Sequence, residues 1–315
     1  MKIRNVDIFI SGAGPAGLLA SISFASLGYS VFCVDPQKPV THANDEGADL
    51  RTTAFLQPAK TFMDSLDLWE KLISYAIPME IMRIIDSAGA NWPPKEKIIK
   101  NFLSSDISDL PFGWNIPNWL LRRAFIEKAS KYRNLELKFG LTSSSFIRRD
   151  DAAFVYLDDG TQIKAKLVIG ADGRNSLIRE KSQIKISRTE FPQKALTFIV
   201  THEKPHRNAS IEIHRSGGPF TFVPLTDFEG KSCSSVVWME SNKNIDRLLA
   251  LKPGDFEKHV NSRSCLHLGR VKVISRITAW PIISQIAKQL TAKRTALIAE
   301  AAHVLPPIGA QGLNM

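Results

Sequence analysis

Residues 7–35 read DIFISGAGPAGLLASISFASLGYSVFCVD, and this stretch decides the fold. The apolar run Ile8–Ile10 leads into a turn whose glycines follow the order G-x-G-x-x-G. An apolar segment over 18–27 comes next, and a second β-type run, 31–34, is closed by Asp35. This order predicts a strand, a tight turn, a helix and a strand, which is the unit that binds dinucleotides.

Each small residue of the turn has a physical task. Gly12 permits the sharp bend, Gly14 lets backbone N–H groups approach a pyrophosphate, and Gly17 allows the helix to pack closely on the strand. Ala16 lies in the first helical turn, where free N–H groups and the helix dipole favour an anion. Asp35 follows Gly12 by 23 residues, as expected for an acid that binds an adenosine ribose. The motif leaves open whether the dinucleotide carries nicotinamide or flavin.

Composition bounds the class of protein. The chain has 315 residues, 44% of them hydrophobic and 23% charged, which is typical of a globular fold with a substantial core. Its three cysteines, Cys33, Cys233 and Cys265, are far apart and form no C-x-x-C pair. We therefore expect no disulfide scaffold, no metal site and a reducing, cytoplasmic setting. No run reaches the roughly 20 apolar residues that a membrane-spanning helix needs.

The net charge of +10 raises the question of an anionic partner. The basic residues form short scattered groups, such as Lys95, Lys97 and Lys100, and no long basic tract with interleaved aromatics. We therefore expect no nucleic-acid partner. An anionic membrane surface is the alternative, at about 1 kcal/mol for each well-placed basic residue. Peripheral contact with the inner face of the membrane stays open at this point.

The first half of the chain mixes helical and strand patterns. Apolar residues at helical spacing predict a helix over 59–75, and a strand follows over 78–88. A polar stretch at 91–109 resembles an excursion into another lobe. A further helix is predicted from Asn118, as its N-cap, to Tyr132.

The second half changes character to short β-type runs. Asp159-Gly160 between two such runs predicts a hairpin. Residues 195–281 predict a mostly antiparallel sheet with one helix at 256–261. A last strand is predicted over 295–299.

Two further motifs follow in fixed order. Residues 167–176 read LVIGADGRNS, and residues 296–314 read ALIAEAAHVLPPIGAQGLN. Together with the glycine turn, they make the chain resemble the flavoprotein aromatic hydroxylases that have a p-hydroxybenzoate-hydroxylase-type fold. Three short sequences are most similar to those of the ubiquinone-biosynthesis hydroxylases: RTTA at 51–54, GWNIPN at 113–118 and GAQGLN at 309–314. The resemblance covers nearly the whole chain.

The resemblance implies an α/β fold, in which a Rossmann-like FAD-binding domain carries an inserted, mostly antiparallel β-sheet substrate domain. The FAD-binding domain would comprise residues 1–77, 110–182 and 290–315. The substrate domain would comprise residues 78–109 and 183–289.

The resemblance also implies which residues bind the FAD. Gly12, Gly14, Ala16 and Gly17 would hold the pyrophosphate, and Asp35 would bind the adenosine ribose. Arg51 and Arg122 would contact the cofactor from outside the first turn, and Asp172 with Gly173 would lie near the FAD. The backbone N–H groups of Gly312, Leu313 and Asn314 would face the pyrimidine edge of the flavin, with Pro306 and Pro307 close by.

Two features depart from the family pattern. Glu300 stands where many members have an aspartate that binds a ribityl hydroxyl, and its extra methylene shifts the carboxylate. Family chains also continue beyond the last motif, whereas this sequence stops at Met315. The resemblance therefore implies a C-terminally truncated member of the family. One alternative to an active enzyme is that the chain is a non-catalytic remnant.

The implied function is an FAD-dependent monooxygenase that hydroxylates a polyprenyl phenol in ubiquinone biosynthesis. NADH or NADPH would reduce the flavin, and O2 would form a flavin C4a-hydroperoxide. A second alternative is an FAD-dependent reductase or epoxidase acting on an isoprenoid lipid. Implied partners are the lipid phenol and a ubiquinone-biosynthesis complex. Substrate contacts are expected around Phe220, Phe222, Pro224 and Trp238.

Overall fold

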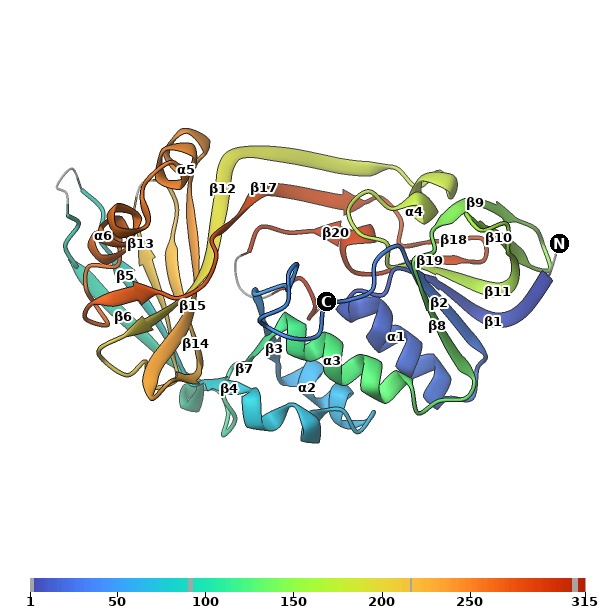
Figure 1. Cartoon of the computed structure of the whole chain (residues 1–315), viewed down its shortest axis with the longest axis horizontal. Coiled ribbons are helices and arrows are strands. Elements are labelled where there is room, and N and C mark those ends of the chain that lie inside the picture. Colours follow the sequence, from blue (N-terminus) through green and yellow to red (C-terminus); the bar gives the residue numbers. More distant parts are fainter. Residues whose placement is uncertain (1–2, 90–92, 216, 308–310, 315) are drawn as a thin grey trace.

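Two lobes make up the computed structural model, which describes residues 3–89, 93–215, 217–307 and 311–314. The long strands β12 (Ile186–His202) and β17 (Thr278–Ala287) run side by side from one lobe to the other (Figure 1). The expected α/β class is confirmed by the mixture of helices with three sheets.

The glycine turn lies in the lobe that carries a largely parallel sheet. Its parallel strands, in spatial order, are β19 (Thr295–Leu297), β11 (Gln162–Gly170), β1 (Ile3–Ser11), β2 (Val31–Asp35) and β8 (Leu135–Phe139). The antiparallel members are β18 (Thr291–Ala292), β10 (Ala153–Leu157) and β9 (Ser143–Arg148). The β10–β11 pairing confirms the hairpin predicted around Asp159-Gly160.

Strand β1 is central because both of its faces are buried. Ile8 and Ile10 point into one apolar cluster, whereas Phe9 points into a second cluster on the opposite face. Helices α1 (Pro15–Ser26) and α3 (Asn118–Ala129) contribute to the first cluster. The short helix α4 (Leu177–Lys181) contributes to the second through Ile178.

A separate three-stranded sheet has the strand order β3 (Thr52–Leu56), β7 (Gly113–Pro117) and β4 (Ile77–Met79). The helix predicted over 59–75 ends early, because α2 spans only Gln57–Asp64. Asp67 adopts a positive φ of 50°, and the N–H groups of Leu66 and Leu68 both donate to the carbonyl of Met63. The rest of that segment forms the 3-10 turns η1 (Trp69–Lys71) and η2 (Ile73–Tyr75).

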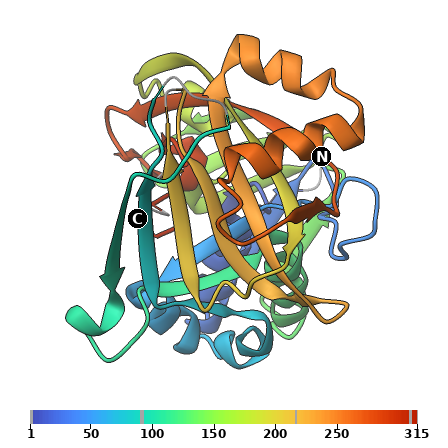
Figure 2. The same ribbon diagram turned by 90° about the vertical axis from the view of Figure 1, so that its left-hand side faces the viewer.

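The second lobe is built on a nine-stranded sheet (Figure 2). Its remaining strands are β20 (His303–Val304), β15 (Lys231–Ser241), β14 (Phe220–Phe228), β13 (Ala209–His214), β5 (Ile81–Asp86), β6 (Ile98–Leu103) and β16 (Val271–Val273). All neighbours pair antiparallel except β13 with β5, which confirms the mostly antiparallel prediction. Apolar side chains of α5 (Asn242–Leu249) and α6 (Pro253–Arg263) share one cluster with this sheet.

Several elements differ from the sequence-based expectation. Strand β6 was not predicted within the polar stretch 91–109, because its residues are all exposed and give no alternation that could reveal it. Pro117, and not Asn118, is the N-cap of α3, because the Asn118 side chain is engaged by Thr53 and Asp49. Strand β20 joins the nine-stranded sheet through β17, although it lies in the range expected to belong to the FAD-binding domain. The domain boundaries stay a prediction.

Acid should weaken the first lobe through Asp7. The hydrogen bond from Lys166 and those from Ser30 lower the pKa of Asp7 to about 2. A depressed carboxyl pKa contributes stability above the unfolded value near 3.8, and this contribution disappears as the pH falls toward 2. We expect Asp7→Asn to flatten the loss of stability between pH 4 and pH 2 in urea titrations, whereas Asp106→Asn, a change at an exposed carboxylate, leaves the slope unchanged.

Candidate functional site

A cavity of about 510 Å³ lies between the two lobes. Its walls come from the start of α1, the segment 49–54, the start of α3, the strands β12, β15 and β17, and the C-terminal segment. Of the residues predicted for the site, the following line it: Gly14, Ala16, Gly17, Arg51, Arg122, Gly173, Glu300, Pro306, Pro307, Gly312 and Leu313. The other predicted residues do not line the cavity: Gly12, Asp35, Asp172 and Asn314.

The turn after β1 requires its glycines for different reasons. Gly12 has a φ of +102°, and a Cβ there would lie 2.3 Å from the carbonyl oxygen of Ala171. A Cβ on Gly17 would lie 1.9 Å from the carbonyl oxygen of Gly12, so α1 and the turn touch through backbone. At Gly14 a Cβ would meet nothing within 4 Å, because this position faces the open cavity.

The start of α1 is suited to an anion. Gly14 is the N-cap and offers no side chain to satisfy the first N–H groups, and no acidic residue occupies the first turn. These N–H donors and the positive end of a 12-residue helix therefore face the cavity beside Ala16. A pyrophosphate fits this end of the cavity.

Two predicted acids accept hydrogen bonds from backbone N–H groups, Asp35 from the glycine turn and Asp172 from the start of α4. Asp35 accepts hydrogen bonds from the backbone N–H of Ala13 at 2.7 Å and of Gln37 at 2.9 Å. Asp172 accepts one from the N–H of Ile178 at 3.2 Å, and burial raises its pKa. Each Asp35 oxygen keeps a second lone pair, so it can accept a further hydrogen bond from a ribose hydroxyl. That contact stays a prediction.

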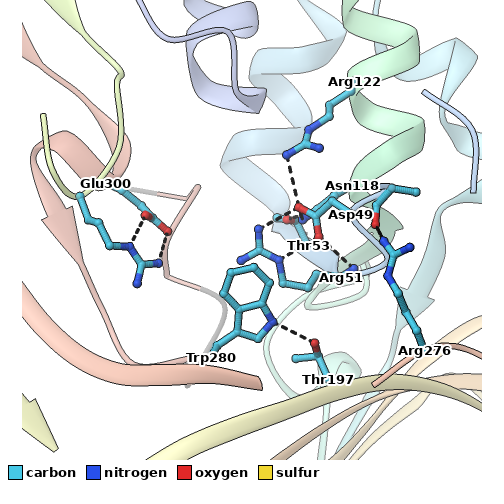
Figure 3. A network of polar contacts seen from close by, with 11 residues as sticks. Asp49, Arg51, Thr53, Asn118, Arg122, Thr197, Arg276, Trp280 and Glu300 are labelled. Carbon is cyan, nitrogen blue, oxygen red and sulfur yellow. Dashed lines mark hydrogen bonds and ion pairs between the residues drawn. The ribbon is translucent and has the colours of Figure 1, made fainter. Parts of the chain in front are cut away.

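Asp49 organises the polar wall formed by the segment 49–54 and the start of α3 (Figure 3). Its carboxylate receives two hydrogen bonds of 2.8 Å from the Arg51 guanidinium, one of 3.1 Å from Asn118 and one of 3.4 Å from Arg122. Burial opposes ionisation of Asp49, but the contacts with these three side chains lower its pKa. The buried Nε of Arg122 has no partner among the described residues, so this arginine retains donor capacity beside the cavity.

Arg51 also joins the lobes. Its guanidinium carbon lies 4.2 Å from the ring centroid of Trp280 on β17, and the Trp280 indole N–H donates to Thr197 on β12 (Figure 3). The Arg276 side chain donates to the carbonyl of Ala48, which ties the same loop to the sheet lobe. Charge on the first lobe is thereby fixed against an aromatic ring of the second.

Glu300 does not stand alone at the cavity edge. Arg174 donates to both of its carboxylate oxygens, at 3.2 and 3.4 Å. Arg174 follows directly after Asp172-Gly173 in the chain, so this ion pair links the last two predicted motifs. Arg174 therefore takes up some of the lone pairs of the Glu300 carboxylate with which a ribityl hydroxyl would form a hydrogen bond.

The C-terminal segment is anchored at Asn314. Its side chain accepts a hydrogen bond from the N–H of Leu56 at 2.8 Å and donates to the carbonyl of Ala54 at 2.7 Å. A ring nitrogen of His303 lies 3.3 Å from the carbonyl oxygen of Gly312. Ile308, Gly309 and Ala310 of the last motif, and Met315 after it, lie outside the described residues.

The aromatic residues expected to contact substrate are placed elsewhere. Phe220, Phe222 and Trp238 are buried in the cluster between the nine-stranded sheet and its helices, and they do not line the cavity. Pro224 instead presents its carbonyl oxygen to the Asn115 amide at 3.0 Å. Other residues of the sheet lobe line the cavity: Ala195, Thr197, Phe198, Ser235, Val236, Val237, Trp280, Pro281, Ile282 and Ile283. Of these, Phe198 and Val236 have their side chains in the same buried cluster as Phe220.

Sequence reasoning missed Asp49, Thr197 and Trp280. The spacing of Asp49 from Arg51 gave a usable signal, since two residues of opposite charge flank one apolar residue just before a strand. Thr197 and Trp280 gave none, because only the pairing of β12 with β17 brings them together.

Comparison with known proteins agrees with this geometry. The sequence model of the family described as "FAD binding domain" matches residues 5–315. The ubiquinone hydroxylase UbiL of Rhodospirillum rubrum is 28% identical over 311 residues, which cover 99% of this chain and 70% of that protein. The 3-demethoxyubiquinol 3-hydroxylase of Escherichia coli is 25% identical over 319 residues, covering 100% and 78%.

Among solved structures, that of P. aeruginosa PqsL in complex with 2-aminobenzoylacetate shares the fold, with a TM-score of 0.81 at 20% identity. The match covers 99% of this chain and 83% of that one. The chain belongs to the FAD binding domain family, and its cofactor is FAD.

Proposed function

We propose that this chain is an FAD-dependent monooxygenase that hydroxylates a phenolic precursor of ubiquinone, with NADH or NADPH as co-substrate. One observation carries the proposal: a single cavity joins the anion-binding start of α1 to an apolar wall of the nine-stranded sheet. The ubiquinone hydroxylases among its relatives supply the substrate class. When bound, FAD supplies the electron transfer from the nicotinamide and the activation of O2.

The chain's own residues would hold the cofactor along this cavity. Gly12, Gly14, Ala16 and Gly17 would receive the pyrophosphate, and Asp35 the adenosine ribose. Arg51 and Arg122, positioned by Asp49, would place positive charge beside it. The remaining proposed contacts come from the later motifs: Asp172, Gly173, Glu300, Pro306, Pro307, Gly312, Leu313 and Asn314.

The sheet lobe would orient the substrate and exclude water. Val237, Ile282 and Ile283 give that side of the cavity a largely apolar surface. An apolar wall holds an aromatic ring with little orientational freedom, and it removes bulk water from the reacting groups. Trp280, fixed by its hydrogen bond to Thr197, closes the same wall toward Arg51.

The lipid nature of the substrate is the finer part of the proposal. A polyprenyl phenol suits an apolar wall, and peripheral contact with a membrane or a ubiquinone-biosynthesis complex would supply it. No helix in the described part of the chain is both long and apolar enough to cross a membrane. Peripheral association, on the cytoplasmic side, stays a prediction.

Isotope labelling tests the proposed reaction. Protein reconstituted with FAD should oxidise NADH or NADPH faster when a short-chain prenyl phenol is added. Under ¹⁸O2, mass spectrometry should then find one labelled oxygen in the phenol. The matched background is the same protein freed of FAD. Nicotinamide oxidation that yields only reduced oxygen species, with no labelled product from any phenol tried, would contradict the proposal.

A further inference from the structure

A second cavity, of about 400 Å³, lies in the sheet lobe and shares no lining residue with the first. It opens where β5, β13, the turn between β12 and β13 and the turn after α6 meet. Its apolar lining consists of Ile81, Pro205, Ala209, Ile211 and Leu268. Its remaining lining residues are all basic or histidine: Arg83, Lys204, His206, Arg207 and His267. Among the described residues, no carboxylate lines it.

The Arg83 guanidinium is held at this cavity by two side chains. Its Nε donates to the Asn101 amide oxygen at 2.8 Å, and its NH1 lies 2.9 Å from the Nε2 of His267. Because a guanidinium can only donate, His267 Nε2 must be the acceptor. The other ring nitrogen of His267 therefore carries the proton and donates to Glu96. Neither direct partner of Arg83 is a carboxylate, and the Glu96 carboxylate reaches it only through the His267 ring.

Lys204 converges on the same residue. Its ammonium lies 3.5 Å from the carbonyl oxygen of His267, and its backbone N–H donates to the carbonyl of Leu268 at 3.0 Å. The nearby Glu203 is turned away, with one oxygen accepting from the N–H of Arg270 at 2.9 Å. Arg83 and Lys204 therefore both contact His267, one at its ring and the other at its carbonyl oxygen.

The turn that carries Arg207 is held in an unusual conformation. Arg207 and Asn208 both have positive φ values, 51° and 58°. His206 fixes this turn, since its Nδ1 accepts from the N–H of Asn208 and its Nε2 lies 3.1 Å from the carbonyl oxygen of Leu225. Burial lowers the pKa of His206, in keeping with a neutral ring whose two nitrogens are both engaged. The exposed Arg207, which lines the cavity, lies on this turn.

We propose that this second cavity binds a free amphipathic organic anion. A phosphate or carboxylate head would lie against Arg83, Lys204 and Arg207, and a short apolar body would cover Ile81 and Pro205. Cations bind such oxyanions through charge-assisted hydrogen bonds. The volume is within the range of small-molecule sites, which combine an apolar lining with a few convergent polar groups. This site is separate from the FAD cavity, so the proposal does not depend on the function proposed there.

Calorimetric titration with three matched probes tests the assignment. Octyl phosphate carries both the head and the body, inorganic phosphate only the head, and octanol only the body. We expect octyl phosphate to bind the FAD-loaded protein at least tenfold more tightly than either of the others. Equal affinity for octanol and octyl phosphate would overturn the proposal, as would binding only to vesicles that contain phosphatidate.

Two charge variants locate the binding. Arg83→Gln should weaken octyl phosphate binding about tenfold, as expected for one lost hydrogen bond to a charged group. Arg207→Gln, a change at an exposed side chain that leaves the packing intact, should weaken it several-fold. Lys243→Gln on α5 is the matched control and should change nothing. Unaltered FAD content would show that each variant is folded, and wild-type affinity in both site variants would overturn the proposal.

Discussion

Gly17→Ala should abolish retention of FAD during purification. The new Cβ would lie 1.9 Å from the carbonyl oxygen of Gly12, and neither backbone segment can move without opening the contact between α1 and β1. Displacing the start of α1 removes N–H donors from the pyrophosphate site. We expect at least about a 100-fold weaker Kd for FAD, which is the loss of two hydrogen bonds to a charged group.

Two further variants separate this steric effect from others. Gly254→Ala adds the same methyl group near the start of α6, where nothing lies within 4 Å, and should leave FAD binding and stability unchanged. Gly14→Ala also meets nothing in the protein, so it should fold normally and weaken only FAD binding. Flavin fluorescence titration gives each Kd, and thermal unfolding without FAD gives the stability. A Gly17→Ala protein with wild-type affinity would show that the close contact is not needed.

Asp49→Ala should have the second largest effect, on the stability of the FAD-free protein. The change leaves the Arg51 and Arg122 guanidinium groups without their shared anion beside the largely buried Asn118. Removing one member of a buried ion pair costs about 3–5 kcal/mol, and the one-third exposure of Arg51 reduces our expectation to about 2 kcal/mol. Urea unfolding at pH 7 measures the difference.

The sign of the pH dependence provides an internal check. The pKa of Asp49 is lowered in the folded protein, so its contribution is present above the unfolded value of 3.8 and disappears as the pH falls through the folded value. The stabilities of the wild-type and Asp49→Ala proteins should therefore converge in acid. Asp45→Ala removes an exposed carboxylate from the same loop and serves as the matched control. A pH-independent gap would show that Asp49 acts through packing instead of charge.

Added FAD should stabilise the Asp49→Ala protein by more than it stabilises the wild type. The cofactor's phosphates would provide the negative charge that Arg51 and Arg122 have lost. Equal stabilisation by FAD would show that these arginines do not face the cofactor, and it would remove both from the proposed binding residues.

Local signals in the sequence were enough for most of the first lobe. The turn after β1 and the hairpin at Asp159-Gly160 depend on backbone conformations that few residues other than glycine adopt easily, so their positions can be read from the chain. The helix predicted over 59–75 was wrong in its length, because the periodicity of apolar residues does not reveal a turn such as that at Asp67. Strand β6 was invisible because an exposed edge strand has no buried face to pattern its residues.

By itself, the sequence determined the strand–turn–helix–strand unit, the order of the three motifs and the family, because each depends on residues that are neighbours in the chain. Only the tertiary structure decided which side chains meet across the cavity. Arg51 contacts Trp280 because β17, paired with β12, runs between the two lobes and brings Trp280 beside the segment that holds Arg51. Arg83 and Lys204 meet at His267 because β5 pairs with β13 beside the turn after α6. Contacts between residues so far apart depend on strand pairing and lobe packing, which no local pattern encodes.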